Sequence, residues 1–145
     1  MSTSRETIRD ALVTLLAAKL VGTDLPVKTV TGSKVDDLAG LTPLVAVLSG
    51  GTRRQRLTFM GTIPTFYLEV QVWVRQATTG WTNAQAEDAL DRIESLIADV
   101  LAENVNEDNW TILEYDGRST VVELMVAGIP FYMERIPVIV STSKE

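Results

Sequence analysis

The chain has 145 residues, a length that suits one domain with a single hydrophobic core, and 46% of them are hydrophobic, which is ordinary for a packed protein. Cysteine and histidine are both absent, so disulfides, thiolate metal sites and Ser-His-Asp or Cys-His mechanisms are excluded. The formal net charge of −6 opposes unaided binding to a nucleic-acid backbone. We therefore expect residues 1–145 to form one domain.

Neither a membrane span nor a leader is expected from the hydropathy pattern. The longest apolar stretches, such as residues 44–48 and 121–126, are far shorter than the roughly 20 residues that cross a bilayer. Residues 1–10 mix charges and have no apolar segment or small-residue cleavage pattern. These features predict a protein that stays in the cytoplasm of the cell that makes it.

The first third of the chain begins with a helix. Ser4 is a suitable N-cap, apolar residues then recur at helical spacing, and Gly22 provides a stop, which predicts a helix over residues 5–21. Glycines and prolines make residues 22–43 a loop-rich passage with at most a short strand at 27–30. The β-rich run at residues 44–48 predicts a central strand.

Residues 49–64 combine glycines and a proline with basic and apolar side chains. We interpret them as a mobile loop, although a connection of this length is uncommon in a compact domain and a hairpin is the alternative. The Gly-Gly-Thr-Arg-Arg run lacks the Gly-Lys-Ser/Thr ending of a phosphate-binding loop. The loop supplies candidates for contact with a partner or another subunit: Arg53, Arg54, Arg56, Phe59 and Met60.

Residues 66–74 alternate between apolar and more polar side chains, which is the clearest strand pattern in the chain. The polar face carries Tyr67 and Trp73, and Trp81 follows the strand. Aromatic residues are enriched at interface centres, so these three are candidate interface anchors. Burial under the next helix or under an adjoining loop is the equally weighted alternative.

Thr82 and Gln85 form a capping-box pattern before an amphipathic helix at residues 84–103. Residues 84–108 hold eight acidic residues against Arg92 alone, so their net charge is −7 and the rest of the chain is close to neutral at +1. The helix face that carries the charge has five candidate interface or lumen residues: Glu87, Asp88, Asp91, Glu94 and Asp99. The oxygen-rich stretch at 103–109 lacks the spacing of a calcium loop.

The last third of the chain consists of strand-like runs at residues 110–115, 119–126 and 131–141. Asp116-Gly117 predicts a two-residue hairpin between the first two runs, and Pro137 indicates an edge strand or a bulge in the third. The full order of elements predicts an α+β fold, with a mostly antiparallel mixed sheet packed against two helices.

The strand at residues 67–74, the helix at 84–101 and the closing strands at 110–115, 119–126 and 131–140 resemble the lambda-type tail terminator proteins of long-tailed bacteriophages. The resemblance covers nearly the whole chain and lies in element order and size. It implies the tail-terminator fold and a structural virion protein at the head–tail junction, assembled in the cytoplasm of the host bacterium, without enzymatic activity, cofactor or metal.

In that family the implied assembly is a hexameric ring of identical subunits. The ring ends polymerisation of the tail-tube protein on one side and receives a head-completion protein on the other. DNA passes through the ring, so carboxylates that face the lumen would keep it from binding there. The resemblance leaves open whether the helix at 84–103 lines this lumen.

Two alternatives remain at this point. A head–tail connector or stopper subunit has a similar size and element pattern, and residues 49–64 are its candidate channel plug. A non-viral, homo-oligomeric ligand-binding α+β module, or less readily an enzyme that uses carboxylates, belongs to a different class and would be favoured by a defined apolar pocket.

Overall fold

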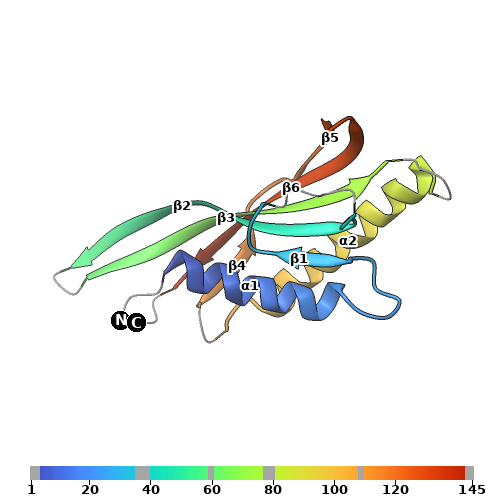
Figure 1. The fold of residues 1–145 in the computed structure, drawn as a ribbon. Coiled ribbons are helices and arrows are strands. Elements are labelled where there is room, and N and C mark those ends of the chain that lie inside the picture. Colours follow the sequence, from blue (N-terminus) through green and yellow to red (C-terminus); the bar gives the residue numbers. More distant parts are fainter. Residues whose placement is uncertain (1–3, 35–39, 59–60, 77–80, 108–109, 143–145) are drawn as a thin grey trace.

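A computed structural model describes residues 4–34, 40–58, 61–76, 81–107 and 110–142, and it shows an α+β fold (Figure 1). Two helices and six strands follow one another along the chain: α1 (Arg5–Leu20), β1 (Thr29–Thr31), β2 (Leu44–Thr58), β3 (Gly61–Arg75), α2 (Asn83–Glu103), β4 (Ile112–Tyr115), β5 (Thr120–Val126) and β6 (Ile129–Ser141). The predicted fold class, an α+β fold with a mostly antiparallel sheet and two helices, is confirmed.

The strands form a single sheet in the order β1-β2-β3-β6-β4, and β5 pairs with the other half of the same edge of β6. Only β1 and β2 are parallel, while every other pair is antiparallel. Both helices lie on one face of the sheet (Figure 1), and the opposite face has no helix over it. The expected short strand near residue 30 is β1, displaced to Thr29–Thr31.

The core forms between the helices and the covered face of the sheet. The alternation predicted for β3 is observed, since Phe66, Leu68, Val70, Val72 and Val74 are each at most 2% exposed. The helices contribute apolar faces built from residues three or four apart. The buried helical residues are Ile8, Leu12, Leu16 and Leu20 in α1 and Ala86, Leu90, Ile93, Ile97, Val100 and Leu101 in α2.

Local capping fixes where both helices begin. The Ser4 side chain accepts a hydrogen bond from the Thr7 N–H, as an N-cap should. At α2 the Thr82 hydroxyl accepts from the Gln85 N–H at 3.1 Å, and the Gln85 side chain accepts from the Thr82 N–H at 2.8 Å. This reciprocal pair is the predicted capping box. Among the described helices, none is long and apolar enough to cross a membrane.

The interpretation of residues 49–64 as a loop is wrong, and the alternative, a hairpin, is correct. β2 continues to Thr58 and pairs with β3 in an antiparallel register that includes Arg53 with Thr65 and Arg56 with Thr62. Gly50 allows the strand to continue, because the register shifts there and a Cβ at Gly50 would lie 3.0 Å from the Tyr67 carbonyl oxygen. The glycines suggested a loop, but Gly50 forms a β-bulge inside a continuous strand.

The predicted hairpin at Asp116-Gly117 is also wrong. β4 and β5 both run antiparallel to β6 along the same edge, so they follow one another instead of pairing. The hairpin turn lies at Ala127 and Gly128, whose φ angles are 50° and 78°. Positive φ at both central residues is the geometry of a type I′ turn, and Ala127 gives no sequence signal for it.

Pro137 lies in neither an edge strand nor a bulge of the β3–β6 ladder. β6 is an interior strand, and its register with β3 is unbroken from Thr65 with Ser141 to Arg75 with Phe131. On the other side, β4 pairing ends at Val138 and β5 pairing begins at Arg135. The Pro137 carbonyl points to this interruption, where it accepts from the Asp116 N–H at 2.8 Å. The proline therefore lacks its N–H where the ladder is already interrupted.

Candidate interaction surfaces

The far end of the β2–β3 hairpin projects beyond the rest of the sheet. We name residues 53–58 and 61–64 the arm, because β3 pairs with β6 only from Thr65 onward. Figure 1 shows the arm extending away from the helices as a two-stranded ribbon. Arg53, Arg54 and Arg56 are exposed on it, whereas the other two candidates, Phe59 and Met60, lie outside the described residues.

The base of the arm and the start of α1 enclose a hollow of about 670 Å³. Its lining is mostly polar and basic: Ser4, Arg5, Glu6, Arg9, Ser49, Thr52 and Arg54. Arg9 holds α1 against the hairpin through a hydrogen bond from its Nη1 to the Ser49 hydroxyl at 3.1 Å. We name Arg5, Arg9, Arg53, Arg54 and Arg56 the basic end of the molecule.

The sequence pattern singles out the arginines of the arm but not Arg5 and Arg9. They are more than forty residues away along the chain, and α1 taken alone has a face of mixed charge. A correct prediction of the hairpin would have supplied the missing signal, because it carries Ser49 and Arg54 back over the N-terminus of α1.

The outward side of α2 carries the predicted negative charge. Glu87, Asp88, Asp91 and Asp99 are exposed, so we name these four with Glu94 the acidic face. Glu94 is half-buried and accepts a hydrogen bond from the Tyr115 hydroxyl at 3.4 Å. The N-terminal half of α2 lies at the opposite end of the molecule from the arm (Figure 1).

A buried carboxylate lies behind this helix. Glu134 is 5% exposed and accepts a hydrogen bond from the Ser119 hydroxyl at 2.6 Å. Burial raises the pKa of Glu134 above its usual value, and the nearby charges of Glu94 and Asp91 raise it further, while the Ser119 hydrogen bond partly opposes them. The sequence singled out Glu94 and Asp91 but gave no indication of Glu134.

The three aromatic candidates do not lie together. Tyr67 and Trp73 belong to the strand face that no helix covers, where Trp73 meets Phe131 edge to face with ring centroids 5.9 Å apart. The Trp73 Nε1 donates to the Gln71 side chain at 3.2 Å. Trp81 lies on the helix side instead, and its Nε1 donates to the Arg75 carbonyl at 2.8 Å.

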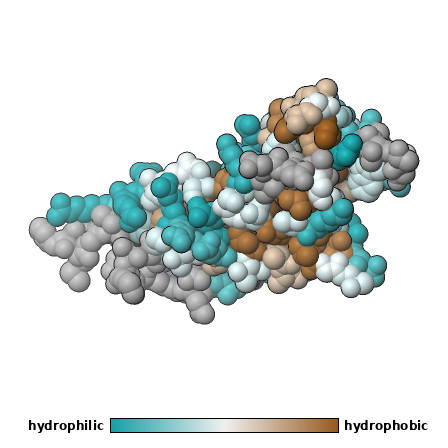
Figure 2. Space-filling model, in the orientation of Figure 1, coloured by the Kyte–Doolittle hydropathy of each residue, from teal (hydrophilic) through white to brown (hydrophobic). Residues whose placement is uncertain are grey.

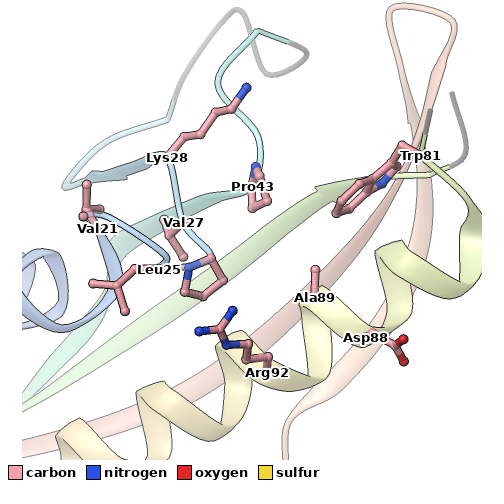
Figure 3. A pocket seen from close by; sticks show the side chains of 11 residues that line it. Val21, Leu25, Val27, Lys28, Pro43, Trp81, Asp88, Ala89 and Arg92 are labelled. Atoms are coloured by element: carbon pink, nitrogen blue, oxygen red, sulfur yellow. The ribbon is translucent and has the colours of Figure 1, made fainter. Parts of the chain in front are cut away.

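Trp81 borders a largely apolar hollow of about 720 Å³ (Figure 3). One wall is the segment after α1, and the other is the first half of α2. Arg92 bridges them, because its Nη2 donates to the Asp24 carbonyl at 3.0 Å. Leu25, Val27 and Pro43 face Ala89 across the hollow. The sequence predicts no site in this loop-rich passage.

The edge strand β5 exposes apolar side chains. Val121 is 53% exposed, Leu124 36% and Met125 71%. Figure 2 shows apolar surface gathered at this β5–β6 end, while the described part of the arm is hydrophilic. Exposed apolar edge strands are prone to pair with another chain, so β5 is a further candidate contact surface.

Within the residues that the structure describes, no group of three or more acidic residues could hold a metal ion. In the oxygen-rich stretch after α2, Asn104 serves as the helix C-cap and its carbonyl accepts from the Trp110 Nε1 at 2.8 Å.

No protein-family model matches the chain, and no curated protein matches it in sequence.

Proposed function

We propose that the chain is a structural subunit of a phage tail terminator: a ring, hexameric as the family resemblance implies, that ends the tail tube and joins it to the head-completion complex. The observation that carries the proposal is the arm. Between its tip and Thr65, the arm is a two-stranded ribbon in which β3 pairs with β2 and not with β6. An isolated hairpin of this kind is only marginally stable in water. A partner that packs against the arm would supply the missing support.

The positions of the candidate surfaces support a ring. The arm lies at one end of the molecule, and the acidic face of α2 and the exposed edge of β5 lie away from it (Figure 1). When the two surfaces that meet are different, the contact is head to tail, and it forms a ring if the rotation closes. The open face of the sheet, with Tyr67 and Trp73, remains available for the tube or head-completion protein.

The charge distribution supports passage of DNA without tight binding. The excess negative charge lies on one segment, residues 84–108, and repels a phosphate backbone wherever that segment approaches it. In this proposal the ring has no catalytic residue and no cofactor, and its partners are other copies of itself, the tail-tube protein and the head-completion protein.

The experiment that tests the proposal measures tube length. The purified protein is added to polymerising tail-tube protein from the same virus, and tube lengths are measured by negative-stain electron microscopy. A terminator shortens the tubes as its concentration rises and appears at one end of each tube. Tubes of unchanged length with bare ends would show that the chain does not end polymerisation.

A ligand-binding module is the second candidate, because the apolar hollow beside Trp81 has a volume of about 720 Å³, within the range of small-molecule sites. Its lining holds two cationic side chains, Lys28 and Arg92, against the carboxylate of Asp88, and would suit an amphipathic, anionic ligand. Native mass spectrometry of the freshly purified protein decides this candidate. A retained small molecule that is lost when Ala89→Trp fills the hollow would support it.

A further inference from the structure

We propose that the basic end of one protomer binds the acidic face of the next. The partner is a second copy of this chain, and the contact joins Arg5 and Arg54 to the N-terminal half of α2. This inference rests on the proposed ring and names the surfaces that close it.

Charge complementarity is the first argument. At the basic end, Arg5, Arg9 and Arg54 line one hollow together with Glu6. The acidic face presents Glu87, Asp88 and Asp91 at the surface, all three exposed. Among the described residues, no ion pair within the protomer involves Arg5 or Arg54 at the basic end, or Glu87, Asp88 or Asp91 on the acidic face.

Placement is the second argument. The basic end and the N-terminal half of α2 lie at opposite ends of the molecule (Figure 1), so one protomer cannot bring them together. Two copies can do so in a head-to-tail arrangement, and each copy then offers the same pair of surfaces to a further copy. Complementary charges of this kind steer association and suppress wrong orientations.

Shape is the third argument. Thr52 and Arg54 lie on the face of the hairpin that turns toward α1, where the hollow of about 670 Å³ forms. Arg53 lies on the opposite face of the same strand, because successive strand side chains alternate, and it is therefore not part of this contact. A helix edge seated at the base of the arm would therefore meet arginines from α1 and from β2 together.

Two matched variants test the contact. The first, Arg5→Glu with Arg54→Glu, reverses the basic end, and the second, Glu87→Lys with Asp91→Lys, reverses the acidic face. All four positions are exposed, so the variants should fold with the thermal stability of the wild type. A control, Lys34→Glu with Arg118→Glu, changes the charge by the same amount as the first variant at exposed positions outside both surfaces.

Ring formation by each variant is measured by native mass spectrometry. We expect each reversed variant alone to assemble at least about tenfold more weakly than the wild type, because like charges then meet at every contact. The control should assemble like the wild type. An equal mixture of the two variants should restore the ring with equal numbers of each, since in an alternating ring every contact again joins opposite charges.

Several results would overturn the contact. Unchanged assembly of both variants would do so and would be consistent with an acidic face that lines the lumen. A mixture that fails to co-assemble would also contradict it. Loss of binding to duplex DNA in the Arg5→Glu, Arg54→Glu variant, with normal ring formation, would assign the basic end to DNA instead. Each of these outcomes leaves the tube-capping test unaffected, so failure of the contact and failure of the terminator proposal can be told apart.

Discussion

Glu134 is the residue whose environment departs most from that of an ordinary surface carboxylate. It lies on the core side of β6, opposite Val72 in the β3–β6 ladder, and only 5% of it is exposed. Because its pKa is raised in the folded protein, folding favours the protonated form. Its contribution to stability is therefore fully present below the pKa of the unfolded chain and is lost as the pH rises through the raised folded pKa.

Glu134→Gln should therefore increase stability in a pH-dependent way. The amide removes the buried charge next to Asp91 and Glu94 and can still accept from the Ser119 hydroxyl. We expect the melting temperature to rise by a few degrees at pH 8 and to change little at pH 4. Thermal denaturation followed by circular dichroism at both values checks this, and an equal shift at both would contradict the pKa argument.

Ala127 is strained by the turn that it occupies. Its φ of 50° lies in the left-handed region, which costs an L-residue about 1–2 kcal/mol, while glycine adopts it freely. Ala127→Gly should stabilise the protein by about 0.5 kcal/mol after the loss of chain entropy. Gly128→Ala is the reciprocal change and should destabilise it by about 1 kcal/mol. Urea denaturation of both variants measures the two values, and a destabilised Ala127→Gly together with a stabilised Gly128→Ala would refute the turn assignment.

Residue-level prediction from the sequence succeeded where a side chain acts through its neighbours along the chain. Thr82 and Gln85 are three residues apart, and their capping box could be predicted because both partners belong to one turn. Glu134 could not be identified, because its burial depends on α2 and Ser119 meeting over β6. Arg5 and Arg9 could not be identified for the same reason, since they share a hollow with residues of a hairpin that is distant in the sequence.

At the scale of elements, α2 packs one side against the core and carries the acidic face on its other side. Leu90 and Ile97 are 4% and 0% exposed, whereas Ser95 on the same helix is exposed. Leu90→Asp or Ile97→Asp places an unpaired charge in the core and should cost more than about 4 kcal/mol, enough to unfold most domains. Ser95→Asp is the matched control. Unchanged melting of Leu90→Asp would mean that the helix faces are assigned wrongly.

Element prediction succeeded for segments with a strong period and failed where glycine was taken as a break. The helices and β3 have apolar residues at regular spacing, so the sequence predicts them and the structure confirms them. Residues 49–64 are expected to be a loop because of their glycines. Their described part belongs to strands instead, because Gly50 forms a β-bulge that lets β2 continue in register with β3. Towards the C-terminal end, Asp116-Gly117 lies between β4 and β5, which do not pair with each other, while Ala127 and Gly128 form the hairpin turn between β5 and β6.

At the scale of the whole molecule, the described surfaces are distributed asymmetrically. A basic arm lies at one end, an acidic helix begins at the other, and an apolar edge strand is exposed at β5. In the proposed function, the charged arm would give specificity and the edge strand would supply apolar contact area, so the two surfaces would bind different partners. The arrangement of these surfaces could not be predicted from sequence, because it depends on the extended hairpin.

Reversal of the arm charges should separate folding from assembly. Replacing Arg53, Arg54 and Arg56 together with Glu changes exposed side chains, so the protein should remain folded with a melting temperature close to that of the wild type. In the proposed function it should fail to support tail attachment. Complementation of a virus that lacks the gene, scored as infectious particles, checks this, and a normal yield would count against the arm as a partner surface.

In the proposed function this chain forms a ring that caps a tail tube. Native mass spectrometry combined with negative-stain imaging, on the protein alone and mixed with its tail-tube protein, tests this most directly. We expect a closed ring of six copies, either free or at the end of a tube. A monomer that ignores the tube and retains a small molecule would contradict it and would favour the ligand-binding module.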